Sequence, residues 1–332
     1  MATNNPAKQK VLLLGRSGSG KTSIRSMIFA NFRARDTSRL GPTLDVENSN
    51  VRFLGKLVLN LWDCGGQDRF MENYFHSQRD HIFRNVSVLV FVFDIRSADN
   101  AKDLQYFDTC LAALADYSPD AHIFVFVHKM DLAPSQLERE RLFARYSDAI
   151  AHRTQRHEER LRSALIFGTS IWDETLYLAW SQIVRALIPN VEDLEDALGT
   201  LCEACRATEV VLFERATFLV VARHSRRKHK DAHRFEKISN IVKQFKLSCL
   251  RMGMGHSVNG FSASNERFRI IISPFTRNTH VLVVTPNRLP SGCVDKEPQF
   301  DAEDHVACSG VTLAAVKANV LAAAPLFDNL IN

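Results

Sequence analysis

The sequence predicts an α/β unit with a mostly parallel sheet over residues 8–190, followed by a smaller α+β unit over residues 191–332. Its 332 residues favour two domains of ordinary size. Up to residue 190, apolar runs typical of strands alternate with segments whose apolar residues recur at helical spacing. Beyond that point strand-like runs follow one another through short connections, which favours antiparallel pairing.

Each element of the first unit follows from one of these patterns. Strands are expected at Val11–Leu14, Val51–Phe53, Lys56–Trp62, Val86–Phe93, His122–Val127 and Leu165–Gly168, with a hairpin around Gly55. Helices are expected at Ser19–Phe32, Lys102–Leu114, Ser135–Arg162 and Glu174–Leu187. Because helices separate most of these strands, the sheet should be parallel and covered on both faces.

The second unit is expected to begin with a helix at Val191–Cys205. Strands are predicted at Glu209–Phe213, Thr217–Ala222, Arg267–Ile272 and His280–Val284, a loop at Pro286–Ser309, and a final helix at Leu313–Leu326. A further helix at His233–Cys249 should bury a stripe made by Phe235, Ile238, Val242, Phe245 and Cys249.

The composition excludes several classes of protein. A net charge of +5 and a pI near 8.8 are too mild to indicate a nucleic-acid partner. Seven cysteines without framework spacing indicate a reducing compartment. Cys202 and Cys205 spell C-x-x-C on a predicted helix, but with neither a thioredoxin-like βαβ context nor a second cysteine pair they are interpreted as core residues. The apolar runs at 88–93 and 123–127 are far below the ~18 residues that span a bilayer. With neither signal peptide nor lipidation motif, we expect a cytoplasmic protein without a direct lipid anchor.

Two other features are interpreted as structural. The basic run at 223–234 is predicted to be a solvated connector, with an acidic partner or an anionic membrane surface as the functional alternative. Trp62, Trp172 and Trp180 are predicted to be packing residues.

A glycine-rich motif, GRSGSGKT, starts at Gly15 directly after the first strand and leads into the first helix. It matches G-x-x-x-x-G-K-[ST] in the strand–loop–helix context that this pattern requires. Glycines let backbone N–H groups surround a phosphate without Cβ clashes, and the helix N-terminus adds partial positive charge. The residues expected to bind phosphates are Ser17, Gly18, Ser19, Gly20, Lys21, Thr22 and Ser23, and the Thr22 hydroxyl should also bind Mg²⁺.

The motif DCGGQ, at 63–67, closes an apolar strand. Asp63 at a strand end suits a contact to Mg²⁺. Gly66 offers a backbone N–H to a γ-phosphate, and Gln67 is the residue type that positions an attacking water. Gln67 is therefore the candidate catalytic residue.

Two more strand-end motifs predict recognition of a base. In HKMD, the Asp131 carboxylate can accept both N–H donors of guanine, which adenine lacks at those positions, and His128 and Lys129 lie beside it. In TSI, the backbone of Ser170 and Ile171 can donate to the guanine carbonyl. Their order and strand-end placement predict a guanine nucleotide.

In these motifs the sequence resembles the Rag family of Ras-like small GTPases, of the RagA/RagB type. The resemblance covers residues 8–285 and includes FANFRARDTSRLGPTLDVE, LWDCGGQDRFMENYF, VHKMDL, TSIWDETLYLAW, LFERATFLV and HRFEKISNIVKQFKLSC. It implies a Ras-like GTPase domain, a roadblock-type dimerisation domain at 191–332, GTP or GDP with Mg²⁺ as ligands, and hydrolysis of GTP. Most Ras-like proteins carry Asn where His128 stands, and Rag proteins share this substitution.

The resemblance also implies which parts move. Thr43 takes the place of the switch threonine that ligates Mg²⁺ and contacts the γ-phosphate, and Thr37 approaches the ribose side. With GTP bound, Thr43 and Gly66 would hold the two switch segments until hydrolysis releases them. Since Arg35 and Arg39 are interpreted as solvated loop residues, hydrolysis should be slow, and an activating protein should accelerate it by about 10³–10⁵-fold.

A Rag-type protein is further expected to form a heterodimer with a RagC/RagD-like GTPase through its C-terminal domain. The resemblance places that dimer on a membrane-anchored scaffold complex at the cytosolic face of the lysosome or vacuole. There it would relay amino-acid sufficiency to the TOR kinase complex. Two alternatives stay open: a nucleotide-dependent scaffold with negligible turnover, and a phosphate-loop ATPase or kinase, against which Asp131 argues.

Overall fold

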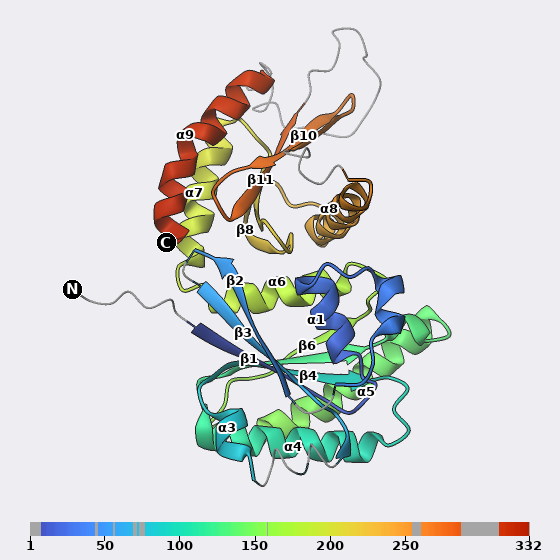
Figure 1. Ribbon diagram of the computed structural model, residues 1–332. Helices are drawn as coiled ribbons and strands as arrows, with labels where there is room; N and C mark the ends of the chain where they lie inside the picture. Colours follow the sequence, from blue (N-terminus) through green and yellow to red (C-terminus); the bar gives the residue numbers. More distant parts are fainter. Residues whose placement is uncertain are drawn as a thin grey trace, which may run out of the picture. The chain divides into compact units, whose positions relative to one another are not determined.

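The computed structural model describes residues 8–43, 46–55, 57–68, 72, 77–157, 159–253, 260–286 and 312–331 (Figure 1). The chain divides into two compact units, Met1–Leu187 and Ile188–Asn332. The boundary predicted at residue 190 lies close to this division.

The first unit is built on a six-stranded mixed sheet. Its strands are β1 (Lys8–Leu14), β2 (Val46–Leu54), β3 (Leu57–Cys64), β4 (Val86–Asp94), β5 (His122–His128) and β6 (Leu165–Thr169). Their order is β2-β3-β1-β4-β5-β6, in which β2 and β3 are antiparallel and every other neighbouring pair is parallel. The predicted α/β class with a mostly parallel sheet is thus confirmed.

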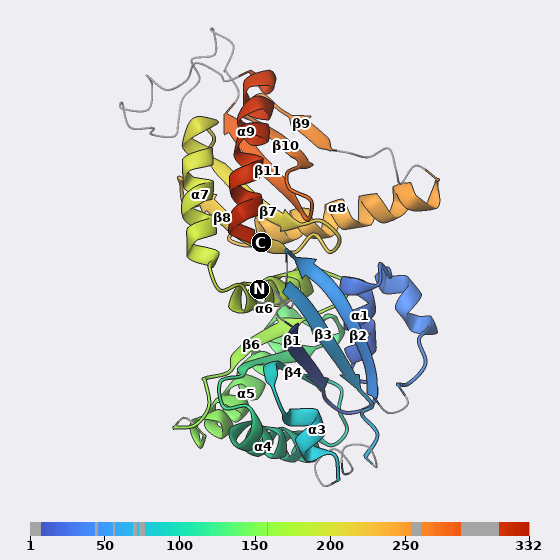
Figure 2. The same cartoon turned by 60° about the vertical axis from the view of Figure 1, so that its left-hand side comes forward.

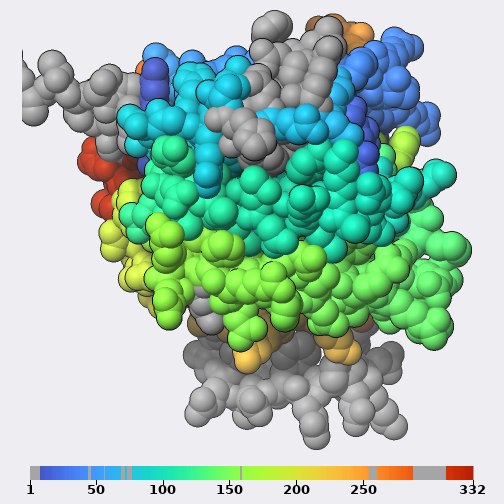
Figure 3. All heavy atoms as spheres, turned by 90° about the horizontal axis from the view of Figure 1, so that it is seen from below, coloured from blue at the N-terminus to red at the C-terminus, as the bar shows by residue number. Residues whose placement is uncertain are grey.

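Helices cover both faces of this sheet. One face carries α1 (Lys21–Phe29) and α6 (Thr175–Leu187), and the other carries α3 (Arg79–Phe83), α4 (Asn100–Tyr117) and α5 (Gln136–Gln155), the last three visible side by side in Figure 3. Alternate residues of the strands point to opposite faces. Accordingly, Phe91 of β4 packs on Phe107 of α4 at 5.1 Å between ring centroids, whereas Phe126 of β5 packs on Trp180 of α6 at 6.4 Å.

Several boundaries in this unit differ from the prediction by a few residues, and the two largest differences have a physical cause. β2 begins at Val46, because a mostly exposed edge strand can pair with β3 without an apolar pattern. α5 ends at Gln155 rather than residue 162, since the chain turns back to bury Leu161 against the core. The short helices η1 (Ala34–Arg39), α3 and η2 (Met130–Leu132) have no clear periodicity in the sequence.

The second unit combines a five-stranded antiparallel sheet with three helices in the described residues (Figure 2). Its elements are α7 (Val191–Ala204), β7 (Glu209–Glu214), β8 (Val220–Ser225), α8 (Arg234–Arg251), β9 (Phe261–Ser264), β10 (Phe268–Pro274), β11 (Thr279–Pro286) and α9 (Leu313–Ile331). The strand order is β8-β7-β11-β10-β9. This is the predicted α+β class.

Helices α7 and α9 lie on one face of this sheet and α8 on the other (Figure 2). The stripe predicted for α8 is right for Phe235, Ile238, Val242 and Cys249 and wrong for Phe245, which is 48% exposed. The buried face of the helix also includes the polar residues Ser239 and Lys243. The apolar pattern alone therefore misplaces the centre of the buried face.

Two strand predictions in this unit need correction. β8 begins at Val220 rather than Thr217, because the Glu214 carboxylate accepts hydrogen bonds from the backbone N–H groups of Ala216 and Thr217 and holds them in a turn. β9 was not predicted, since the four residues Phe261–Ser264 are all exposed. Apart from Pro286, the loop predicted at Pro286–Ser309 lies outside the described residues.

The cysteines and tryptophans interpreted as packing residues are buried, with one exception. Cys202 and Cys205 are buried, and burial raises the pKa of the Cys202 thiol to about 11, as expected of a core cysteine. Trp62 and Trp180 are buried, but Trp172 is 56% exposed, so its assignment as a packing residue is wrong.

One described helix, α9, passes the length and composition criteria for a membrane span. In this unit it packs on α7, and the Phe327 ring packs against the tilted ring of Phe275 at 4.8 Å between centroids.

Candidate functional site

The carboxyl ends of the parallel strands bring the predicted residues to one edge of the first sheet. The strand register sets Leu13 beside Asp63, Asp94 beside His128, and His128 beside Thr169. Because each strand ends at this edge, the loops that follow β1, β3, β5 and β6 all open there. This is where ligands bind in open α/β sheets.

The loop between β1 and α1 requires glycine at two positions. Gly15 has φ of 141°, and a Cβ there would collide with the carbonyl oxygen of Val92. Gly20 has φ of 100°, and a Cβ there would come within 2.8 Å of the His128 ring. The exposed residues Ser17 and Gly18 form the tip of the loop, and Ser19 is buried.

Lys21 is the first residue of α1, and its side chain reaches back into this loop. Its ammonium group is buried and donates hydrogen bonds to the carbonyl oxygens of Gly15 and Arg16, at 2.7 and 2.9 Å. Burial lowers the pKa of Lys21 to about 8. A buried cation enclosed by a glycine-rich loop at a helix N-terminus fits an anionic phosphate group.

Thr22, Thr43 and Asp63, the three predicted Mg²⁺ contacts, meet at the start of α1. The hydroxyl oxygens of Thr22 and Thr43 are 2.7 Å apart. Asp63 is fully buried, its Oδ2 accepts a hydrogen bond from Arg25 at 3.1 Å, and its Oδ1 has no hydrogen-bond partner among the described residues. Burial raises the pKa of this carboxyl.

These oxygens fit Mg²⁺, a hard cation that takes oxygen ligands and often completes its shell with substrate phosphates and water. No cluster of three or more His, Cys, Asp or Glu side chains suited to a metal occurs in the described part of the chain. The ligands of the cation would therefore be the Thr22 and Thr43 hydroxyls and phosphate oxygens. The Oδ1 atom of Asp63, which has no hydrogen-bond partner among the described residues, would lie near these ligands.

Gly66 packs directly on the loop between β1 and α1, residues 15–20, which we call the phosphate loop. Its carbonyl oxygen accepts a hydrogen bond from the Ser17 N–H at 2.7 Å, and a Cβ on Gly66 would collide with the backbone of Arg16 and Ser17. Gln67 follows at once, and its buried Oε1 has no hydrogen-bond partner among the described residues. An unpaired amide oxygen beside the phosphate loop fits the predicted role of orienting a water molecule.

The predicted base-recognition residues also come together. The Ser170 hydroxyl donates to Oδ1 of Asp131 at 2.6 Å, which fixes the orientation of the carboxylate. Nδ1 of the buried His128 lies 2.9 Å from the Thr169 hydroxyl, while the other edge of its ring faces Gly20. His128 thus links the base side of the site to the phosphate loop.

The remaining predicted residues occupy simpler positions. Ser23 lies in the first turn of α1, and the half-buried Ile171 follows Ser170 after β6. Thr37 is buried in η1 and donates its hydroxyl to the carbonyl oxygen of Ala34 at 2.7 Å, so its role at the ribose side stays a prediction.

Sequence reasoning missed three residues that support this set, Arg16, Arg25 and Asp94, and included Thr169 only as the first residue of the TSI motif. Asp94 accepts a hydrogen bond from Lys129 at 2.6 Å, and Arg25 joins Asp63 to Glu47 of β2. Asp94 closes β4, so its strand-end placement is the signal that could have found it.

Residues 10–242 match the family described as "Gtr1/RagA G protein conserved region". The chain belongs to the Gtr1/RagA family. It is 53% identical over 283 residues to Ras-related GTP-binding protein A of Dictyostelium discoideum, covering 83% of this chain and 89% of the relative. It is 52% identical to GTP-binding protein gtr1 of Schizosaccharomyces pombe, covering 83% of this chain and 88% of the relative.

A more distant relative of this Gtr1/RagA-family chain is human Ras-related GTP-binding protein C. The two are 25% identical over 299 residues, which cover 89% of this chain and 72% of the relative. Membership of the family identifies the first unit as a Ras-like GTPase domain and the second as a roadblock-like domain. As a member of this family the chain binds GTP or GDP with Mg²⁺, and the sheet edge is the candidate site for them.

Proposed function

We propose that this protein is a guanine-nucleotide-dependent regulatory switch that hydrolyses GTP and works as a heterodimer. The observation that carries the proposal is the 2.7 Å separation of the Thr22 and Thr43 hydroxyl oxygens. Thr22 belongs to α1, whereas Thr43 precedes β2. Nucleotide contacts at these two hydroxyls hold the two segments together, and loss of the γ-phosphate contacts releases the second segment.

Different residues of the site bind the phosphates, orient the water and recognise the base. Lys21 donates to phosphate oxygens, and Gln67 orients the attacking water through its free amide oxygen. Asp131, oriented by Ser170, accepts the N–H groups of guanine. Mg²⁺, when bound, neutralises charge that develops on the phosphates. Turnover is slow without an activating protein, which supplies further stabilisation of that charge.

The proposed partner is a RagC- or Gtr2-like chain, which binds through the C-terminal unit. Human Ras-related GTP-binding protein C and GTP-binding protein GTR2 of Saccharomyces cerevisiae are 25% and 29% identical to this chain. Ile241 and Phe245 of α8 are 67% and 48% exposed, which supports a protein contact there. The heterodimer is held by a scaffold complex at the lysosomal or vacuolar membrane, where it signals amino-acid sufficiency to the TOR kinase complex.

Two variants of the purified heterodimer test the switch. Thr22→Asn should weaken GTP binding more than GDP binding, because the lost hydroxyl acts on the metal shared with the γ-phosphate. Gln67→Leu should bind GTP normally but lose hydrolysis stimulated by the activating protein. The proposal fails if Thr22→Asn leaves the preference between GTP and GDP unchanged. A wild-type protein that binds GTP with negligible turnover would favour the scaffold alternative, and one that prefers ATP would favour the ATPase alternative.

A further inference from the structure

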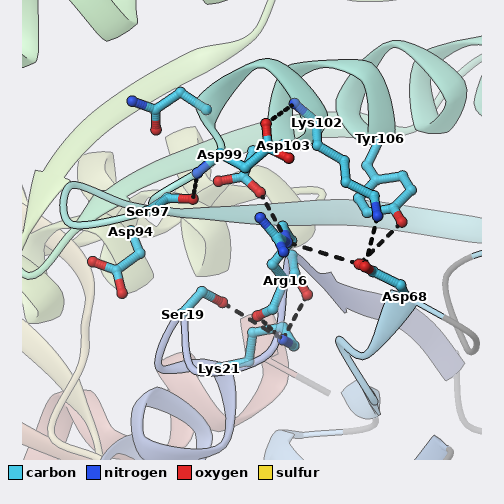
Figure 4. Close-up of polar contacts among 12 residues, drawn as sticks. Arg16, Ser19, Lys21, Asp68, Asp94, Ser97, Asp99, Lys102, Asp103 and Tyr106 are labelled. Atoms are coloured by element: carbon cyan, nitrogen blue, oxygen red, sulfur yellow. Dashed lines mark hydrogen bonds and ion pairs between the residues drawn. The ribbon is translucent and has the colours of Figure 1, made fainter.

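A cluster of charged side chains connects the phosphate loop, the segment that carries Gln67, and α4. Its centre is Asp68, the residue after Gln67 (Figure 4). Oδ2 of Asp68 accepts a hydrogen bond from the Lys102 ammonium at 2.6 Å, and Oδ1 accepts one from the Tyr106 hydroxyl at 3.2 Å. Both oxygens are therefore engaged, which fixes the orientation of the carboxylate.

The phosphate loop joins the same cluster through Arg16. Its Nε lies 3.4 Å from Oδ1 of Asp103 and 3.9 Å from Oδ1 of Asp68, so one guanidinium faces two carboxylates (Figure 4). Asp103 is buried in the first turn of α4, and burial raises its pKa, with the positive charge of Arg16 acting in the opposite direction. A buried carboxylate needs such a partner to remain charged.

The partners of Asp68 differ in burial, and the more buried partner is the firmer attachment. The side chain of Asp68 is 43% exposed and that of Lys102 is 32% exposed, so this ion pair alone contributes little stability. Tyr106, however, is only 7% exposed and is packed in the core of the first unit. Its hydroxyl gives Asp68 a rigid point of attachment on α4.

We infer that Asp68 is a positioning residue for Gln67, held on α4 by Lys102 and Tyr106 and on the phosphate loop by Arg16. The inference rests on the proposed function, since it concerns the hydrolytic role of Gln67. Gln67 lies between two fixed points: Gly66, bonded to Ser17, and Asp68, bonded to α4. Fixing both neighbours restricts the directions that the Gln67 side chain can take, which orients its amide oxygen toward the reacting water.

The test uses the full-length protein with its co-purifying partner. Asp68→Asn and Tyr106→Phe should each slow single-turnover release of inorganic phosphate from GTP by about 10- to 100-fold. Affinity for GTP and GDP should stay unchanged, because none of these side chains touches Lys21 or Asp131. Asp108→Asn is the matched control: it breaks the 3.2 Å ion pair between Asp108 on the same helix and Arg153, away from the loop.

Two further readouts separate positioning from a merely structural role. The backbone amides of Gly66 and Gln67 should exchange with deuterium faster in Asp68→Asn than in Asp108→Asn. In a Gln67→Leu background, Asp68→Asn should slow hydrolysis no further. The inference is overturned by wild-type hydrolysis in Asp68→Asn, by parallel losses of affinity and rate, or by additive effects with Gln67→Leu. If the wild-type protein binds GTP without hydrolysing it, the proposed function fails, and amide exchange alone decides the inference.

Discussion

The ammonium group of Lys129 donates a hydrogen bond to the carbonyl oxygen of Gly18 at 2.6 Å, across 111 residues of sequence. The same group bonds the Asp94 carboxylate at 2.6 Å, so Lys129 connects the ends of β4 and β5 to the tip of the phosphate loop. Its backbone has φ of 65°, a left-handed conformation that a lysine adopts at some energetic cost. Through these two hydrogen bonds Lys129 holds the tip of the phosphate loop in position.

Replacing Lys129 should weaken nucleotide binding, because the phosphate loop loses this attachment. Lys129→Met keeps most of the aliphatic stem but removes both hydrogen bonds, each of which has the charged ammonium group as its donor and is worth about 1.5–3 kcal/mol. We expect affinity for GDP to fall by about 10- to 100-fold, measured by displacement of a fluorescent nucleotide. Lys8→Met, at the opposite end of β1, is the matched control and should bind like the wild type. Wild-type affinity in Lys129→Met would show that the loop keeps its shape unaided.

Base choice should depend on Asp131 and its orientation by Ser170. Asp131→Asn replaces a double acceptor with a group that has one acceptor and one donor, so GDP should bind about 100-fold more weakly and xanthosine diphosphate more tightly. Ser170→Ala should weaken GDP without any gain for xanthine, because the carboxylate remains. Competition binding measures both, with Asp120→Asn in an exposed turn as the control. Unchanged guanine preference in Asp131→Asn would remove this residue from base recognition.

His128 should make the first unit sensitive to acid. Burial, reinforced by the charge of Lys129, lowers its pKa from 6.5 to about 4. Between these values the unfolded chain binds more protons than the folded one, so the free energy of unfolding falls as the pH falls from about 6.5 to about 4. The loss attributable to this residue is at most about 3 kcal/mol.

The variant His128→Asn should flatten that dependence. Since the three tryptophans, at 62, 172 and 180, all lie in the first unit, their fluorescence during denaturant unfolding reports this unit alone. The difference in unfolding free energy between pH 7 and pH 5 should be smaller in His128→Asn than in the wild type. His152→Asn, on the exposed side of α5, should behave like the wild type. Equal slopes for all three proteins would contradict a depressed pKa at His128.

The sequence predicts the site well where its residues are adjacent in sequence or stand at strand ends. GRSGSGKT is a continuous motif, and parallel topology alone brings Asp63 and His128 to the same edge as the loop. It does not predict the contacts of Arg16 with Asp68 and Asp103, because no local pattern pairs a loop arginine with a distant helix. Helical spacing likewise identified the apolar residues of α8 but not which of them the sheet would leave exposed.

The exposed side of α8 should be the surface that binds the partner chain. Ile241 and Phe245 are one turn apart, are 67% and 48% exposed, and cannot reach the core beneath the helix. Ile241→Asp or Phe245→Asp places a charge in the proposed apolar interface, so co-purification of the RagC/Gtr2-like chain should be lost while GDP binding is retained. Leu321→Asp, at an exposed position on α9 of the same unit, is the matched control and should keep the partner. If Leu321→Asp releases the partner and the α8 variants do not, the heterodimer forms through α9 instead.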